Sequence, residues 1–196
     1  MLRYYLIAIF GGIAFFSLLA IFVGGVVWWF AVLGVFASAA AAFGIDALVA
    51  VIVRWYPEEK IDPFSGYFAA RGWERKCYVR LGIRRWKDRI PEMGGLLAHF
   101  SKKQVADRHD NAYLLKFMRE TCYAEVMHLI SIPAGFLILL LFPRYILWFG
   151  LPVAAVNALL QIMPVLVQRY VRPFLAATYR RNEQLAARQA SQETQE

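Results

Sequence analysis

The residues best suited to chemistry lie in one short run, where Glu120, Glu125 and His128 occur within nine positions. On a helix, Glu125 and His128 are three residues apart and share a face, and Glu120 lies about 80° around the axis from His128. A carboxylate that orients a histidine allows the imidazole to remove a proton from a hydroxyl group. The spacing therefore predicts His128 as a general base, with Glu125 or Glu120 as the orienting carboxylate.

Two other interpretations of the same residues stay open. An ExxH pair contributes to metal sites in di-iron bundles, but those sites need two such pairs and two further carboxylates, whereas this chain has one pair. A metal-dependent lipid-modifying hydrolase with Glu120, Glu125 and His128 as ligands is one alternative, although we predict no metal site. The other is a non-catalytic membrane scaffold or lipid-binding subunit in which Glu125 and His128 only fix helix packing.

Polar side chains also interrupt two apolar stretches. Asn157 and Gln161 follow helical spacing, and Asp46 precedes the basic residue Arg54 by eight positions. Polar groups inside membrane spans are costly and mark functional sites or bonds between helices. We expect Asp46, Gln161, Glu125 and His128 to converge in the cytoplasmic half of the membrane, where Asp46, Asn157 and Gln161 contact the substrate. Packing between helices is the alternative role for the two amides.

A dense group of cations surrounds one aromatic residue in the run Arg84-Arg85-Trp86-Lys87. Arginine and lysine recognise phosphate and carboxylate groups, and Trp86 would anchor the run at the membrane interface. We predict a substrate-binding role for these four residues. Ordinary contact with lipid headgroups is the alternative.

The elements that position these residues follow from the distribution of apolar residues. The chain of 196 residues is 60% hydrophobic with a mean hydropathy of +0.45, and its apolar residues form two blocks. A span needs about 20 apolar residues, so each block fits a hairpin of two helices. The predicted fold is all-α, a polytopic membrane protein with four transmembrane helices at about residues 4–23, 26–53, 126–142 and 145–167. Glycine pair Gly24-Gly25 and the dipeptide Pro143-Arg144 would make the turns.

Basic residues fix the predicted orientation. Residues 54–119 carry 15 Lys and Arg against 8 Asp and Glu, and five arginines follow the fourth span. The positive-inside rule therefore places both termini and the middle segment in the cytoplasm of a multi-pass protein of the cell membrane. The predicted parts are hairpin 1–53, interfacial helical segment 54–123, hairpin 124–167 and tail 168–196, with disorder from Ser191. The net charge of +8 serves topology and contact with membrane lipids, and we predict no nucleic-acid partner.

Several motifs together resemble the glycosyl-4,4'-diaponeurosporenoate acyltransferases, enzymes of carotenoid pigment biosynthesis. The most specific is the stretch of residues 120–128, ETCYAEVMH. The others are Trp86-Lys87 with Pro91-Glu92, Phe100-Ser101-Lys102-Lys103, and Asn157 with Pro164 and Gln168-Arg169-Tyr170. The similarity extends over roughly residues 57–173.

This resemblance implies a membrane O-acyltransferase that moves a fatty acyl chain onto a hydroxyl of a lipid or glycolipid acceptor. The expected donor is an acyl thioester, acyl-CoA or acyl-carrier protein, whose phosphates Arg84, Arg85 and Lys87 would bind. Attack of a hydroxyl on a thioester needs no metal or redox cofactor, so we expect none. Asn157 or Gln161 would hydrogen-bond the acceptor or the developing oxyanion.

Overall fold

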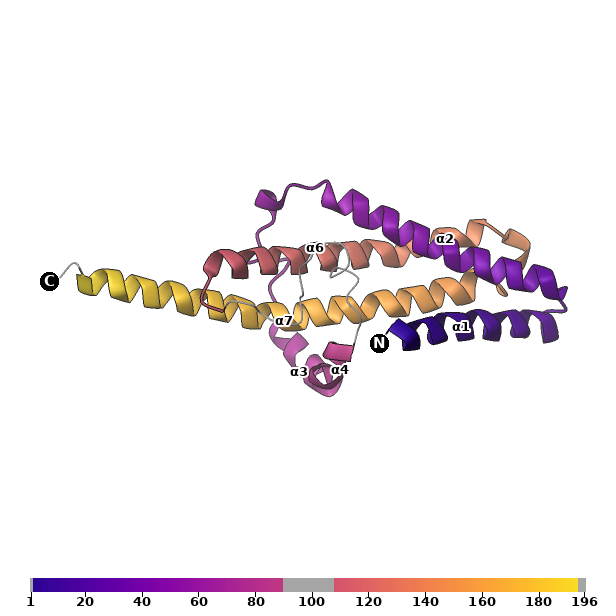
Figure 1. The fold of residues 1–196 in the computed structure, drawn as a ribbon, viewed down its shortest axis with the longest axis horizontal. Helices are drawn as coiled ribbons and strands as arrows, with labels where there is room; N and C mark the ends of the chain where they lie inside the picture. Colours follow the sequence, from indigo (N-terminus) through magenta and orange to yellow (C-terminus); the bar gives the residue numbers. More distant parts are fainter. Residues whose placement is uncertain (1, 90–107, 194–196) are drawn as a thin grey trace. The chain divides into compact units, whose positions relative to one another are not determined.

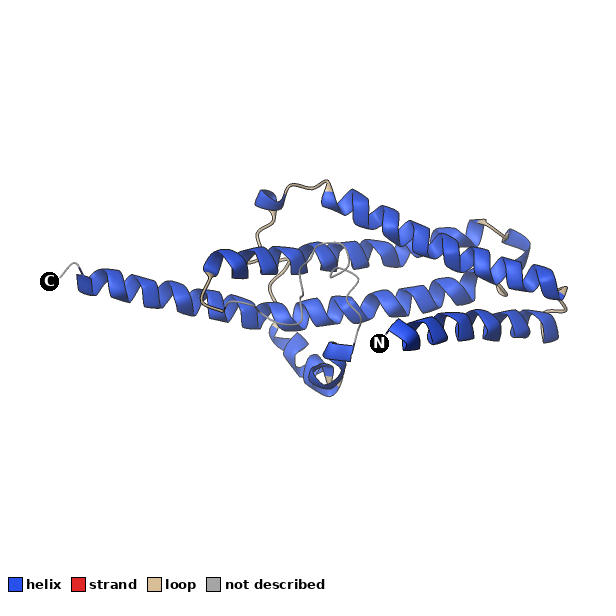
Figure 2. Cartoon of the chain, in the orientation of Figure 1, coloured by secondary structure: helices blue, strands red, loops and turns tan. Residues whose placement is uncertain are grey.

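A computed structural model describes residues 2–89 and 108–193, and these residues form helices and loops without a strand (Figure 2). The all-α prediction is confirmed at this level. The chain divides into two compact units, which we describe separately. The first unit comprises Met1–Trp55 and Val126–Val165, and the second comprises Tyr56–Glu125 and Leu166–Glu196. The main helices are α1 (Leu2–Phe22), α2 (Trp28–Arg54), α3 (Gly72–Arg80), α4 (Ile83–Trp86), α6 (Asn111–Gly135) and α7 (Gly150–Glu193).

The first unit begins with a hairpin of α1 and α2 (Figure 1). The chain turns at Gly25, whose φ of +63° is a conformation that glycine adopts without strain. Gly34 of α2 lies against the ring of Phe149, and a Cβ at this position would come within 2.4 Å of that ring. Phe30 packs its ring edge-on against Phe142, Tyr145 and Phe149. Small residues and interlocking aromatic rings therefore hold this end of the unit together.

The third predicted span is less regular than its sequence indicates. Helix α6 ends at Gly135, and a 3₁₀ helix, Phe136–Leu140, continues it, where a span over 126–142 is predicted. Pro133 lies inside α6, and because proline has no N–H it cannot donate the hydrogen bond of a regular helix there. A second 3₁₀ turn, Pro143–Tyr145, precedes α7, which begins at Gly150 rather than at residue 145.

Three helices are long and apolar enough to cross a membrane: Trp28–Arg54, Asn111–Leu140 and Gly150–Glu193. A shorter apolar helix covers Leu6–Phe22. Large apolar side chains on these elements are exposed, among them Phe22, Trp28 and Leu140. Apolar surface of this extent is typical of helices that face lipid. Membrane association agrees with the prediction, and the four-span arrangement stays a prediction.

The second unit combines the middle segment with parts of α6 and α7. Leu114, Phe117 and Met118 of α6 form a buried cluster with Leu175 of α7. The connection that follows α2 contains a short 3₁₀ helix, Glu58–Lys60, and then leads to α3 and α4. The helices α3 and α4 of the middle segment are therefore short, and their position at the membrane interface stays a prediction.

Helix α7 continues to Glu193, so it includes Ser191–Glu193, where the sequence predicts disorder. Alanine, leucine, glutamine and arginine dominate residues 184–190, and all four have high helix propensity. The motif residues Pro91-Glu92 and Phe100-Ser101-Lys102-Lys103 lie outside the described residues.

Candidate functional site

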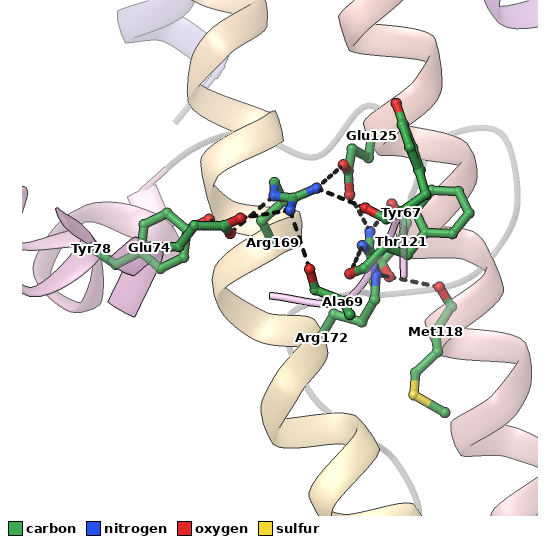
Figure 3. Close-up of polar contacts among 10 residues, drawn as sticks. Tyr67, Ala69, Glu74, Tyr78, Met118, Thr121, Glu125, Arg169 and Arg172 are labelled. Atoms are coloured by element: carbon green, nitrogen blue, oxygen red, sulfur yellow. Dashed lines mark hydrogen bonds and ion pairs between the residues drawn. The ribbon is translucent and has the colours of Figure 1, made fainter. Parts of the chain in front are cut away.

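The second unit contains a buried network of two arginines and two glutamates (Figure 3). Arg169 of α7 donates two hydrogen bonds to Glu74 of α3, from Nε to Oε2 at 3.1 Å and from Nη2 to Oε1 at 2.7 Å. Its Nη1 also donates to Oε1 of Glu125 at 2.6 Å. One guanidinium therefore joins a carboxylate of α3 to a carboxylate of α6, and the paired geometry with Glu74 is the strong one for this group.

Arg172 lies one helical turn further along α7 and completes the network. Its Nη2 lies 2.7 Å from Oε2 of Glu125, and its Nε donates to Oγ1 of Thr121 at 2.9 Å. Nη1 donates to the backbone carbonyl of Phe68 at 3.0 Å, and the guanidinium lies 5.0 Å from the centre of the Phe68 ring. Arg172 thus holds the loop before α3 against α6 and α7.

These four charges balance and are withdrawn from water. The side chains of Glu125 and Arg172 are 0% and 3% exposed, and those of Glu74 and Arg169 are 5% and 18% exposed. A buried ion needs a partner of opposite charge, and each of the four side chains has one in the network. Its direct effect is to fix the loop and α3 in one place within the second unit.

The phenol of Tyr78 extends the network at its outer end, where its hydroxyl donates to Oε2 of Glu74 at 2.5 Å. Burial alone would raise the pKa of the Glu74 carboxyl, but the hydrogen bonds from Arg169 and Tyr78 and the Arg169 charge outweigh it and lower this pKa below its ordinary value. Burial and the bond to the Glu74 carboxylate raise the pKa of the Tyr78 hydroxyl. Glu74 is therefore a stable carboxylate and Tyr78 a stable phenol at neutral pH.

The first unit contains a second set of polar side chains joined by hydrogen bonds, which come from α2, α6 and α7. His128 Nδ1 lies 2.5 Å from Gln161 Oε1, and Gln161 Nε2 donates to Asp46 Oδ2 at 2.6 Å. Asn157 Nδ2 donates to the other oxygen, Asp46 Oδ1, at 3.4 Å. A histidine is thereby connected to a carboxylate through one amide.

Glu125 and His128, the two residues of the ExxH motif, have different hydrogen-bond partners. Glu125 bonds to the arginines of the second unit, whereas the bond that we describe for His128 is to Gln161 of the first. Glu120 is 8% exposed and lies on α6 in the second unit. The catalytic roles of Glu120, Glu125 and His128 remain predictions, and so do the substrate contacts of Asp46, Asn157 and Gln161.

The predicted phosphate-binding residues lie on and next to α4. Arg84 and Arg85 are exposed, and Lys87 Nζ pairs with Asp88 Oδ1 at 2.7 Å. The indole Nε1 of Trp86 donates to the carbonyl of Leu81 at 2.9 Å, which closes the short helix onto the end of α3. The binding role of Arg84, Arg85, Trp86 and Lys87 remains a prediction.

Sequence reasoning missed Glu74, Tyr78, Arg169 and Arg172 as members of one network. In the sequence these arginines indicate topology. Their spacing of three residues nevertheless places them on one helix face, as the spacing of Thr121 and Glu125 does on α6. The arginine pair on one helix and the pair Thr121 and Glu125 on the other could have indicated that the two helix faces bond to each other. In residues 2–89 and 108–193 no group of three or more His, Cys, Asp or Glu side chains is arranged to hold a metal ion.

Comparison with known proteins gives one family. A family model described as glycosyl-4,4'-diaponeurosporenoate acyltransferase matches residues 64–181, more than half of the chain. The matched range includes both arginines, both glutamates and His128. No curated protein and no solved structure matches the chain.

Proposed function

The chain belongs to the glycosyl-4,4'-diaponeurosporenoate acyltransferase family, and from that premise we propose that it transfers a fatty acyl chain to a sugar hydroxyl of a membrane glycolipid. The family description names the reaction class and a glycosylated carotenoid acid as the acceptor. The acceptor of this chain would be a glycolipid of the same kind, and the donor an acyl thioester, acyl-CoA or acyl-carrier protein. The reaction would take place at the cytoplasmic leaflet.

His128 is the proposed general base. It would take the proton of the acceptor hydroxyl while the hydroxyl oxygen forms an ester bond to the thioester carbonyl carbon. As the carbon–sulfur bond breaks, the departing thiolate would receive that proton from the imidazolium. The single observation that supports this assignment is a half-buried histidine, held by a hydrogen bond to Gln161, within the range matched by an acyltransferase family.

The test is acyl transfer by the purified full chain in vesicles, with a glycosylated carotenoid acceptor and an acyl-CoA donor, followed by mass spectrometry of the product. His128→Ala should lower the rate by about 100-fold or more, as expected on losing a general base. His109→Ala removes a histidine from an exposed bend outside the proposed site and should leave the rate unchanged. Unchanged transfer by folded His128→Ala protein would refute the assignment.

Lipid profiles of cells with and without the protein identify the acceptor independently. The expected difference is one glycolipid that loses a single acyl group when the protein is absent. A profile without such a lipid would argue against the proposed reaction itself, whichever residue acts as base.

A further inference from the structure

The chain from Asp46 through Gln161 to His128 fixes more than the position of the histidine. We infer that Asp46 and Gln161 are positioning residues that hold His128 as the tautomer with its proton on Nδ1 and its lone pair on Nε2. This inference rests on the proposed role of His128 as base. It replaces the predicted orienting carboxylate, Glu125, with Asp46 acting through an amide.

The direction of each hydrogen bond follows from the chemistry of the groups. A carboxylate only accepts hydrogen bonds, so the group that Gln161 turns toward Asp46 must be its NH₂, at 2.6 Å from Oδ2. The carbonyl oxygen of Gln161 then faces His128 Nδ1 at 2.5 Å, and a carbonyl can only accept. Nδ1 must therefore donate. A neutral imidazole carries one N–H proton, so its lone pair is on Nε2.

Asp46 itself is held by more than one donor, which keeps its orientation fixed. Asn157 donates to Oδ1, and the hydroxyl of Ser131 is a further hydrogen-bond partner of this carboxylate. Gly135 leaves room for the amide, because a Cβ there would come within 2.7 Å of Asn157 Nδ2. A carboxylate in an apolar helix is costly unless donors surround it, and here the donors come from two other helices.

The hydrogen bonds that link Asp46, Gln161 and His128 also stabilise the charged form of the base. When His128 takes the hydroxyl proton on Nε2, the imidazolium keeps Nδ1–H bonded to the Gln161 carbonyl. The negative charge of Asp46, transmitted through the polarised amide, would stabilise the imidazolium until the thiolate removes the proton. In hydrolytic triads a carboxylate that bonds Nδ1–H directly has this role, and here one amide separates the two groups.

Single substitutions test the direction of the hydrogen bonds between Asp46, Gln161 and His128. Asp46→Asn replaces one accepting oxygen by an NH₂ group, which cannot accept a hydrogen bond from Gln161 or Asn157. The Gln161 amide can then turn its carbonyl toward position 46 and its NH₂ toward His128. Gln161→Glu places two carboxylates together. We expect either change to lower kcat by about 100-fold. KM for both substrates should stay within about twofold, because this inference has the two residues act on His128, in place of the substrate contacts that the sequence predicts. Gln184→Glu, at an exposed position of the same helix, is the matched control and should keep the wild-type kcat.

The decisive variant exchanges the two groups. In Asp46→Asn/Gln161→Glu the amide at position 46 can donate to the new carboxylate at position 161, which accepts from Nδ1 as the glutamine carbonyl does. The total charge and the size of both side chains are kept. We expect kcat to return to within about tenfold of the wild type, a recovery that only interacting residues produce.

A spectroscopic readout separates positioning from packing. Nitrogen-15 NMR of histidine-labelled full chain in lipid distinguishes a protonated from an unprotonated ring nitrogen, and the His128 signal is the one absent from His128→Ala. The inference requires Nδ1–H in the wild type and the exchange variant, and a loss of that preference in Asp46→Asn. If Asp46→Asn fails to fold, the tautomer and kcat of the exchange variant alone decide.

The outcomes also separate this inference from the proposed function. An Nε2–H tautomer in the wild type, or an exchange variant no more active than the single variants, would overturn the positioning role while His128 stays the base. Full activity of His128→Ala would instead overturn the base, and the tautomer measurement would still show whether Asp46 and Gln161 orient the ring.

Discussion

At the scale of single residues, Glu125 shows why a buried ion pair is better evidence for a fixed geometry than for net stability. Its carboxylate is fully buried between Arg169 and Arg172. Withdrawing four charges from water costs nearly as much as their pairing returns, so the complete network adds little net stability. The loss of one member leaves uncompensated charge, and that is costly. Removing one member should therefore lower the stability of the protein by more than the complete network adds to it.

Glu125→Gln makes this asymmetry measurable. The change removes the charge that faces both arginines and should destabilise the protein by about 3–5 kcal/mol, the usual cost of breaking a buried pair. Tryptophan-fluorescence melting in detergent should show a clear fall in Tm. Glu59→Gln makes the same chemical change at an exposed position and should leave Tm nearly unchanged. Equal Tm values for the two variants would contradict the buried pairing.

Glu74 gives the network a dependence on pH. Because its pKa is lowered in the folded state, the unfolded state binds more protons near the ordinary value of 4.5, and stability rises with pH in that range. The stabilisation from Glu74 is therefore complete above about pH 4.5 and is lost as pH falls through the lower folded pKa. We expect Glu74→Gln to melt below the wild type at pH 7, with the gap narrowing toward pH 3. A gap that stays constant over this range would contradict the pairing of Glu74 with Arg169.

At the scale of elements, α4 presents two exposed arginines. Arg84 and Arg85 are exposed, unlike the paired Arg169 and Arg172. If they bind the phosphates of an acyl-CoA donor, Arg84→Gln/Arg85→Gln should raise KM for the donor by about tenfold and leave kcat unchanged, because uniform binding is lost. Arg75→Gln/Arg80→Gln removes the same charge from exposed positions of α3 and is the control. An equal rise in KM for both double variants would show a general charge effect instead.

The helices can be predicted because each depends on a pattern within one stretch of sequence. The site is harder to predict because its contacts join residues that are far apart in the sequence. Apolar runs of about 20 residues and the Gly24-Gly25 break indicate α1 and α2 directly, and helical spacing places Asn157 and Gln161 on one face. The hydrogen bond that Arg169 donates to Glu125 joins residues 44 positions apart. It depends on how α6 and α7 are rotated about their axes, which periodicity does not specify. The same rotations decide whether Glu125 or Asp46 orients His128.

At the scale of the whole molecule, the number of membrane crossings decides which residues share a side. Three helices have the length and hydropathy of spans, and Leu6–Phe22 is shorter. If this first helix also crosses, position 3, the middle segment and the tail all lie on one side of the membrane, which the positive-inside rule predicts to be the cytoplasmic side. If it does not, position 3 lies on the opposite side from the other two. The difference is one crossing, and it decides where the amino-terminal end of the first helix lies.

Cysteine labelling distinguishes the two arrangements, with the chain's own thiol as one probe. Cys77 is partly exposed in α3, whereas Cys122 is fully buried, so Cys122→Ala leaves one reactive site in the middle segment. Replacing Cys77 by serine as well provides a background for Arg3→Cys and Ser191→Cys.

Four crossings predict that a membrane-impermeant maleimide labels none of the three sites in intact cells and all three in inverted vesicles. Arg144→Cys, in the exposed turn before α7, is the control that should react in intact cells. Labelling of Arg3→Cys in intact cells would establish three crossings, and labelling of Cys77 there would place the middle segment, and with it the proposed donor site, outside the cytoplasm.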